Sequence, residues 1–106
     1  MLQVRLANFH DCRKLWEWRN ETNTRNSSFN IDLISYDDHK AWFSTRIKDP
    51  DTPIFIVEDS DGLRVGYVRF DIVGSDADTS VSIDENHRGK GYGSKAIQLG
   101  CRNVLQ

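Results

Sequence analysis

The sequence has 106 residues, of which 38 % are hydrophobic and 28 % charged, a balance typical of one globular domain spanning residues 1–106. Its net charge of -2 supplies no basic field for nucleic acid, and no apolar run is long enough to cross a membrane. Because no segment resembles a signal peptide either, we expect a cytoplasmic protein that binds neither nucleic acid nor membrane.

The first third of the chain predicts a strand and a helix. Apolar and polar residues alternate over Leu2–Leu6, which is typical of a half-buried strand. Asn8 is a suitable N-cap, Asp11 follows in a variant of the capping box, and the helical pattern fades near Asn20. The stretch from 21 to 32 is rich in Asn, Ser and Thr, so we expect a loop there.

A second helix and a meander of strands follow. Ser35 and Asp38 form a capping box, and the apolar spacing that begins there ends before Pro50. Turn-forming residues then separate three strand-like segments, Ile54–Glu58, Leu63–Val73 and Asp78–Asp84. The order predicts an α+β (α/β) domain with an antiparallel meander and flanking helices.

A glycine-rich loop lies between the last predicted strand and a helix that begins near Gly91. It reads Arg88-Gly89-Lys90-Gly91-Tyr92-Gly93. Glycines leave backbone N–H groups uncovered, and a helix N-terminus attracts anions, so the pattern favours a phosphate cradle. Ser94 and Gly91 stand where the dinucleotide and Walker motifs need other residues. The alternative is a tight turn with solvated basic side chains.

The pattern Arg88-x-x-Gly91-x-Gly93 between a strand and a helix resembles the acetyl-CoA motif of the GNAT family of N-acetyltransferases. The order of elements is similar to the N-terminal two thirds of that fold, with its last strands and helix missing. The resemblance implies that acetyl-CoA is the co-substrate. The implied cofactor-binding residues are Val81, Ser82, Ile83, Arg88, Gly89, Lys90, Gly91, Tyr92, Gly93 and Ser94. The backbone N–H groups of Ser82 and Ile83 are the implied oxyanion donors.

A narrower resemblance concerns the acceptor. Trp18-Arg19-Asn20, Asn23-Thr24 and His39-x-x-Trp42-Phe43 resemble the GNAT branch that acetylates UDP-linked 4-amino sugars in pseudaminic acid-type biosynthesis. It implies that Arg19 and His39 contact the nucleotide sugar. Another sugar amine or an N-terminal residue remains an alternative acceptor. For Arg19 the alternative is a helix C-terminal cation, and for His39 a hydrogen-bonded structural histidine.

Two residues of the long predicted strand complete the candidate acceptor site. Arg69 and Asp71 share one strand face, which either faces the acceptor or is solvated. In the family the leaving thiolate is commonly protonated by a tyrosine on a later helix, which this sequence does not include. We therefore assign no catalytic acid, and the alternative function is a catalytically inactive acetyl-CoA-binding or oligomerising module.

Two further expectations concern metals and assembly. Cys12 and Cys101 are distant from each other and from any CxxC pattern, and the three histidines show no ligand spacing, so we expect reduced thiols and no metal. The last predicted helix carries an apolar stripe of Ile97, Cys101, Val104 and Leu105. With no later element to cover this stripe, we expect a homo-oligomer, most simply a homodimer.

Overall fold

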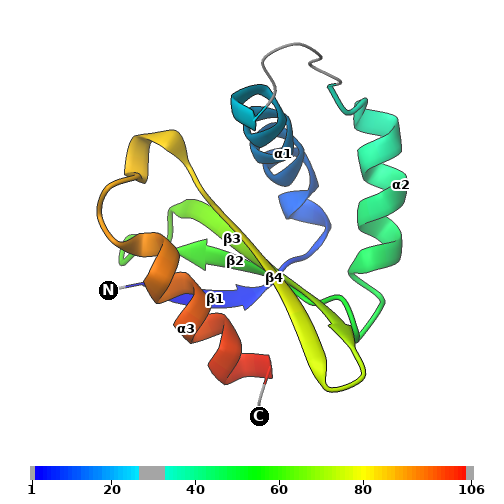
Figure 1. Cartoon of the computed structure of the whole chain (residues 1–106). Helices are drawn as coiled ribbons and strands as arrows, with labels where there is room; N and C mark the ends of the chain where they lie inside the picture. Colours follow the sequence, from blue (N-terminus) through cyan, green and yellow to red (C-terminus); the bar gives the residue numbers. More distant parts are fainter. Residues whose placement is uncertain (1, 27–32, 105–106) are drawn as a thin grey trace.

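The computed structural model describes residues 2–26 and 33–104 and is a mixed α+β domain (Figure 1). In chain order its elements are β1 (Gln3–Leu6), the 3₁₀ helix η1 (Phe9–Asp11), α1 (Cys12–Asn26), α2 (Tyr36–Arg46), β2 (Ile54–Glu58), β3 (Arg64–Val73), β4 (Asp76–Ile83), the 3₁₀ helix η2 (Glu85–His87) and α3 (Tyr92–Val104). The predicted fold class and the antiparallel meander are confirmed.

The four strands form one sheet in the order β1-β2-β3-β4, and each neighbouring pair is antiparallel. A two-residue turn joins β3 to β4, and its Gly74 has a φ of 62°, which favours glycine. Among the described strands β4 lies at one border of the sheet, so one of its edges carries no strand partner.

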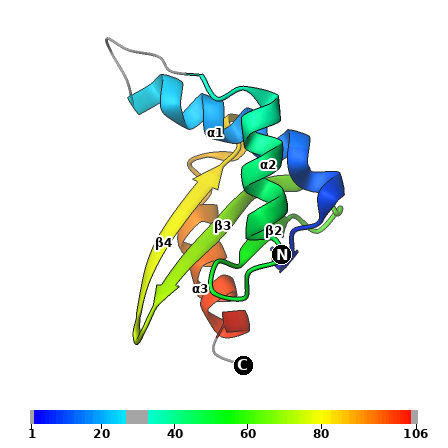
Figure 2. The ribbon, with the colours of Figure 1, turned by 90° about the vertical axis from the view of Figure 1, so that its right-hand side faces the viewer.

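Helices cover both faces of the sheet. α1 and α2 lie on one face and α3 on the other (Figures 1 and 2). The strands explain this arrangement, because successive side chains point to opposite faces. Ile54 and Ile56 of β2 pack with α1 and α2, whereas Phe55 and Val57 pack on the side of α3.

The start of the first helical segment is confirmed, but its predicted end is wrong. Asn8 caps η1 in a capping box with Asp11, and α1 follows directly. α1 then continues to Asn26, beyond the predicted end near Asn20. The Asn20 side chain bonds both backbone groups of Ile34, at 2.7 and 3.2 Å, instead of competing for its own backbone. Residues 27–32 of the predicted loop lie outside the described residues.

The apolar stripe of α3 is not left uncovered as expected. Ile97, Cys101 and Val104 are partly buried and pack against the side chains of β2 and β3, and Leu105 lies outside the described residues. Gly100 allows the close approach, since a Cβ there would lie 2.9 Å from the Phe70 ring. The expectation of self-association therefore loses the observation on which it rested.

A buried carboxylate links the first strand to the helix layer. Asp11 is 1 % exposed, and the Arg5 guanidinium contacts both of its oxygens, at 2.8 and 2.9 Å. Arg64 of β3 adds a third contact at 3.2 Å. Burial is the largest influence and opposes ionisation of this carboxyl, but the contacts with Arg5, the Asn8 N–H and Arg64 together outweigh it, and the pKa of Asp11 lies below its usual value.

The described residues contain neither a membrane-spanning helix nor a cluster of metal-binding side chains. None of the helices within residues 2–26 and 33–104 is long and apolar enough to cross a membrane. In the same part of the chain, no three His, Cys, Asp or Glu side chains gather as a metal site would require. The thiols of Cys12 and Cys101 are unpaired.

Candidate functional site

The hydrogen-bonding direction of β4 determines which backbone groups face its open edge. The Phe70 N–H of β3 donates to the Pro53 carbonyl at 3.1 Å, on the side of β2. Because backbone groups alternate along a strand, those of Tyr67 face the other way, toward β4. Ser82 is the register partner of Tyr67, so the Ser82 N–H is directed at β3.

Val81 and Ile83 consequently present their backbone groups to the open edge. The Ile83 carbonyl confirms this direction, because it accepts a hydrogen bond at 3.0 Å from Arg88, which lies beyond the strand. Of the two predicted oxyanion donors, Ile83 has the required orientation. The Ser82 N–H is turned inward, and Val81 supplies the second edge N–H.

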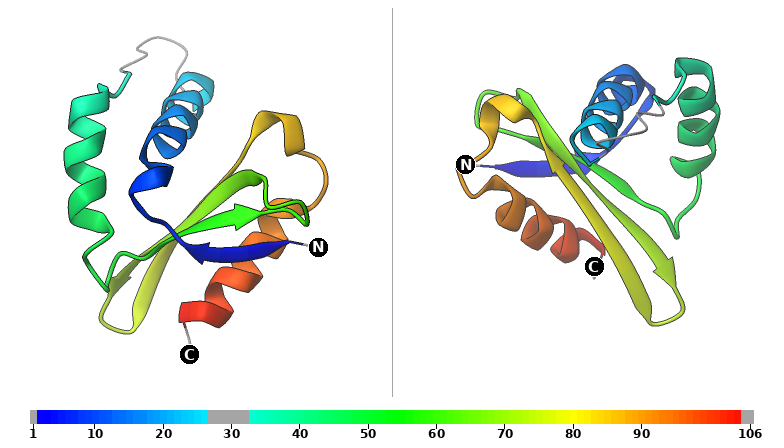
Figure 3. Two further views of the ribbon diagram at one scale, coloured as in Figure 1. Left: turned by 180° about the vertical axis from the view of Figure 1, so that it is seen from behind. Right: turned by 45° about the horizontal axis from the view of Figure 1, so that its top comes forward.

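A hollow of about 370 Å³ lies between this edge and the glycine-rich loop; we call it the loop hollow. Its lining residues are Val81, Ser82, Ile83, His87, Arg88, Gly89, Gly91, Tyr92, Gly93 and Ser94. Nine of the ten predicted cofactor-binding residues are thus brought together, and Lys90 is the exception. Figure 3 shows the chain turning at the end of β4 and passing through η2 into α3.

The three glycines of the loop differ in what the backbone requires. Gly89 and Gly91 have φ values of 81° and 75°, in the region that favours glycine. Gly93 has no such requirement, and a Cβ there would meet no atom within 4 Å. The open space over Gly93 lies at the N-terminus of α3, where the first-turn N–H groups lack helical partners and no acidic side chain is present. This arrangement suits an anion.

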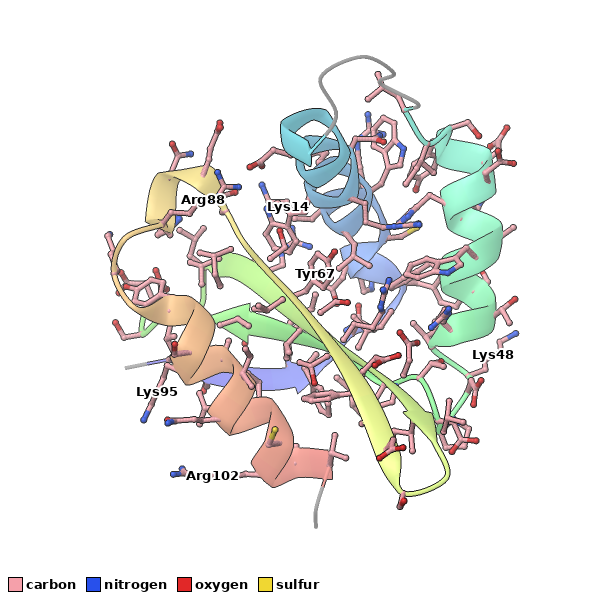
Figure 4. All side chains as sticks on the ribbon, viewed as in Figure 1. Lys14, Lys48, Tyr67, Arg88, Lys95 and Arg102 are labelled. Carbon is pink, nitrogen blue, oxygen red and sulfur yellow. The ribbon has the colours of Figure 1, made fainter. Side chains whose placement is uncertain are left out.

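Ion pairs and hydrogen bonds attach the loop to α1. Asp84 accepts a hydrogen bond from the Trp18 indole N–H at 3.1 Å and pairs with Lys14 at 3.5 Å. Burial opposes its ionisation, but the Asn86 N–H, Trp18 and Lys14 together hold the pKa of Asp84 below its usual value. The Arg88 guanidinium, which is labelled in Figure 4, also forms an ion pair with Glu21 of α1.

One loop residue was missed by the sequence analysis. His87 lines the loop hollow and stacks on Tyr92, with ring centroids 6.4 Å apart. Its position directly before Arg88 in the sequence could have indicated that His87 belongs to the site. The stack gives Tyr92 a packing contact at the start of α3.

A second hollow, of about 300 Å³, lies on the face of the sheet that α1 and α2 cover; we call it the arginine hollow. Its lining residues are Arg19, Ile34, Tyr67, Arg69, Ser80, Val81 and Ser82. The two hollows share Val81 and Ser82, so they meet at β4. Arg19 and Arg69 were predicted for an acceptor site, whereas Ile34, Tyr67 and Ser80 were not.

Arg19 is held in the arginine hollow by stacking and by one hydrogen bond. Its guanidinium carbon lies 3.9 Å from the centroid of the Trp42 ring, and Nη1 donates to Nδ1 of His39 at 3.0 Å. Among the described residues no carboxylate lies within ion-pair distance of it. Burial, with the nearby Arg69 and Arg46, lowers the pKa of Arg19 from its usual value.

His39 is placed behind Arg19 and does not line the hollow. It is fully buried, and its Nε2 lies 2.8 Å from the Cys12 carbonyl, which can only accept a hydrogen bond. Nε2 therefore carries the proton, and Nδ1 accepts from Arg19. Burial, together with the charge of Arg19, lowers the pKa of His39 and keeps the ring neutral. His39 thus orients Arg19.

Arg69 and Asp71 have different positions. Arg69 lines the hollow and donates to the Ser80 hydroxyl at 3.3 Å. Asp71 is not part of the lining; it pairs with Arg46 of α2 and lies 3.5 Å from Nε of Arg69. Asp71 therefore orients the arginine cluster, and the hollow itself carries the positive charges of Arg19 and Arg69.

Sequence comparison identifies one family. The family model of the acetyltransferase (GNAT) family matches residues 11–103, which include both hollows. No curated protein is a significant match to the sequence.

Solved structures share the fold. The N-acetyltransferase from Staphylococcus aureus Mu50 is 21 % identical with a TM-score of 0.78, over 99 % of this chain and 67 % of that one. The yncA protein from Salmonella typhimurium with its cofactor acetyl-CoA is 25 % identical with a TM-score of 0.73, over 100 % and 66 %. The spermidine N-acetyltransferase from Vibrio cholerae in complex with CoA and spermine is 24 % identical with a TM-score of 0.82, over 97 % and 63 %. The chain thus spans about two thirds of the length of these relatives.

Proposed function

The chain belongs to the acetyltransferase (GNAT) family, and on this premise we propose that it transfers the acetyl group of acetyl-CoA to a primary amine. One observation carries the proposal. Nine residues predicted from the glycine motif and the preceding strand line a single hollow between an open strand edge and a helix N-terminus. The acetyl-CoA bound by the Salmonella typhimurium relative supports the choice of co-substrate.

The loop hollow fits the pyrophosphate of coenzyme A. A Cβ added at Gly89, Gly91 or Gly93 would meet no atom within 4 Å, so the loop backbone is uncovered there, and the dipole of α3 adds about 0.3 to 1 kcal/mol for an anion at its N-terminus. Gly93 supports this fit most directly, because the fold itself does not require a glycine there.

We assign the acetyl end of the co-substrate to the open edge of β4. Acetyl-CoA supplies an activated carbonyl carbon with a thiolate leaving group. The N–H groups of Val81 and Ile83 point out from the edge, so they are the donors available to the carbonyl oxygen as it gains negative charge. The Ser82 N–H is directed at β3 and is therefore not available as a donor.

We place the acceptor amine in the arginine hollow, which shares Val81 and Ser82 of β4 with the loop hollow. For the acceptor we propose a nucleotide-linked amino sugar, in accordance with the motifs around Arg19 and His39. Guanidinium groups bind phosphate oxygens through paired N–H donors, and Arg19 and Arg69 both line this hollow. The positive charges of Arg19 and Arg69 repel the ammonium groups of a polyamine, so they disfavour an acceptor such as the spermine bound by the Vibrio cholerae relative.

The cellular setting is part of the proposal. The unpaired thiols of Cys12 and Cys101 suit a reducing compartment, and we propose the cytoplasm. We also retain a homodimer as a proposal, to be measured by analytical sedimentation over a range of protein concentrations.

Acetyl-CoA binding tests the site. Gly91→Ala introduces a side chain at a positive φ in the loop, and Gly62→Ala does the same, at 80°, in the β2–β3 hairpin. The two variants carry the same kind of backbone strain, so only Gly91→Ala should weaken acetyl-CoA binding in calorimetry. Equal affinities for both variants and the unaltered chain would contradict the loop assignment.

Free-thiol release tests the reaction. The chain is supplied with acetyl-CoA and either a UDP-linked 4-amino sugar or spermidine. We expect release with the amino sugar. Thiol release with spermidine but not with the amino sugar would contradict the proposed acceptor class. Acetyl-CoA binding with no thiol release for any amine would support a binding module.

A further inference from the structure

Tyr67 is a buried tyrosine whose hydroxyl has no hydrogen-bond partner among the described residues. The residue is 7 % exposed, and its ring stacks on the Trp18 ring with centroids 6.0 Å apart. Across the described ranges 2–26 and 33–104, no group forms a hydrogen bond with the hydroxyl, and the oxygen is not sealed from solvent. Buried tyrosine hydroxyls usually have a partner, so this one requires an explanation.

The position of Tyr67 suggests what the hydroxyl contacts. Tyr67 lines the arginine hollow, and its register partner Ser82 lines both hollows. Figure 4 shows Tyr67 in the space between the sheet and α1. Tyr67 therefore lies beside the segment of β4 where the two hollows meet, which is where the proposed reaction places the thioester and the amine.

Burial and charge also suit a proton donor. Burial raises the pKa of Tyr67, so the hydroxyl is protonated at neutral pH. Arg69 and Arg19 oppose this rise, because their positive charges stabilise the phenolate. A group that holds its proton at rest, and whose anion is stabilised by two guanidinium groups, has the properties of a general acid.

We propose that the Tyr67 hydroxyl is the catalytic acid that protonates the leaving thiolate, an inference that rests on the proposed acetyl transfer. The amine nitrogen forms a bond to the carbonyl carbon and the carbon–sulfur bond breaks. The sulfur takes the Tyr67 proton and leaves as the free thiol of coenzyme A. The phenolate then takes the proton that the nitrogen loses on becoming an amide, which restores Tyr67.

The other two tyrosines of the sequence lie elsewhere. Tyr36 is on α2, where its ring packs edge-on against Trp16. Tyr92 stacks on His87 at the glycine-rich loop, at the site proposed for the pyrophosphate. Neither lines the arginine hollow.

The variant Tyr67→Phe tests the proposal, because it removes the hydroxyl and keeps the ring on Trp18. With a UDP-linked 4-amino sugar, we expect kcat to fall roughly 100-fold or more, the usual contribution of a positioned acid, and the affinity for acetyl-CoA to stay unchanged. In the unaltered chain kcat should decline at alkaline pH as Tyr67 ionises, and this decline should be absent from the variant.

Tyr36→Phe is the matched control and should leave kcat unchanged. Incorporation of 3-fluorotyrosine, whose phenol is more acidic, provides a second test should Tyr67→Phe not fold, because the alkaline decline should then move to lower pH. A Tyr67→Phe chain with the kcat and pH profile of the unaltered chain would overturn the assignment of Tyr67 and leave the proposed function intact. No turnover by the unaltered chain with any amine would overturn both.

Discussion

Nη1 of Arg19 donates to Nδ1 of His39 at 3.0 Å, and this bond joins a charged residue of the arginine hollow to a fully buried imidazole. The Cys12 carbonyl accepts from the opposite nitrogen of the ring, so the ring has one tautomer that satisfies both contacts. Protonation of His39 would place a second positive charge against Arg19 and remove the acceptor at Nδ1. The orientation of Arg19 therefore depends on a neutral histidine.

The free energy of unfolding should decrease as the pH falls below the usual pKa of histidine, because His39 takes up a proton more readily in the unfolded chain. Its pKa in the folded chain lies below the usual 6.5, so above about pH 6.5 the ring is neutral in both states. As the pH falls through 6.5, the unfolded chain binds a proton before the folded chain does, and the free energy of unfolding decreases. Urea denaturation at pH 7.5 and pH 5.5 measures the difference.

A control variant separates His39 from the other histidines. His10 is exposed in η1, so His10→Gln should retain the decrease seen in the unaltered chain. His39→Gln should reduce it. A decrease that is the same in both variants would show that other groups cause it.

Arg19→Gln should affect the acceptor and not the co-substrate. A hydrogen bond to a charged group contributes about 1.5 to 3 kcal/mol, so we expect the KM for a nucleotide-linked amino sugar to rise roughly 10- to 100-fold. Acetyl-CoA affinity, measured by calorimetry, should not change. Arg46→Gln is the control, because Arg46 also lies near the Trp42 ring but pairs with Asp71 outside the hollow. A larger effect from Arg46→Gln than from Arg19→Gln would contradict the assignment.

Asp11→Asn should destabilise the fold strongly. The carboxylate is 1 % exposed and contacts both Arg5 and Arg64, so its removal leaves Arg64 without this anion and Arg5 with Glu58 alone. Because the Arg5 and Arg64 side chains are 35 % and 37 % exposed, the loss is that of hydrogen bonds between charged groups, about 1.5 to 3 kcal/mol, measurable by urea denaturation. Asp59→Asn, in the exposed β2–β3 hairpin, is the control and should change stability by less than about 1 kcal/mol. Equal losses would show that the Asp11 pairs contribute little.

The sequence predicted what depends on neighbours along the chain. The caps at Asn8 and Ser35, the meander and the glycine-rich loop all rest on residues a few positions apart, and all are present. The loop hollow could be predicted for the same reason, since its two parts, the end of β4 and residues 87–94, are nearly continuous.

Features that depend on distant contacts could not be predicted. α1 continues past Asn20 because that side chain bonds to Ile34, fourteen positions later. In the sequence, Tyr67 cannot be distinguished from any other aromatic residue of a strand. Its position becomes apparent only in the fold, where it pairs with Ser82 and lines the same hollow as Arg19. The direction of the Ser82 N–H likewise follows from the register in which β3 and β4 pair. The alternation of apolar and polar side chains in the sequence does not give this register.

Gly93→Ala should separate binding from stability. Gly93 lies in the first turn of α3, where alanine favours the helix by up to about 1 kcal/mol relative to glycine, and its Cβ would meet no protein atom. The fold should thus be as stable as before or slightly more stable. The same Cβ would enter the space proposed for the pyrophosphate, so we expect acetyl-CoA to bind more weakly. Thermal unfolding and calorimetry on one sample measure both effects, and tighter or unchanged binding by the alanine variant would place the anion elsewhere.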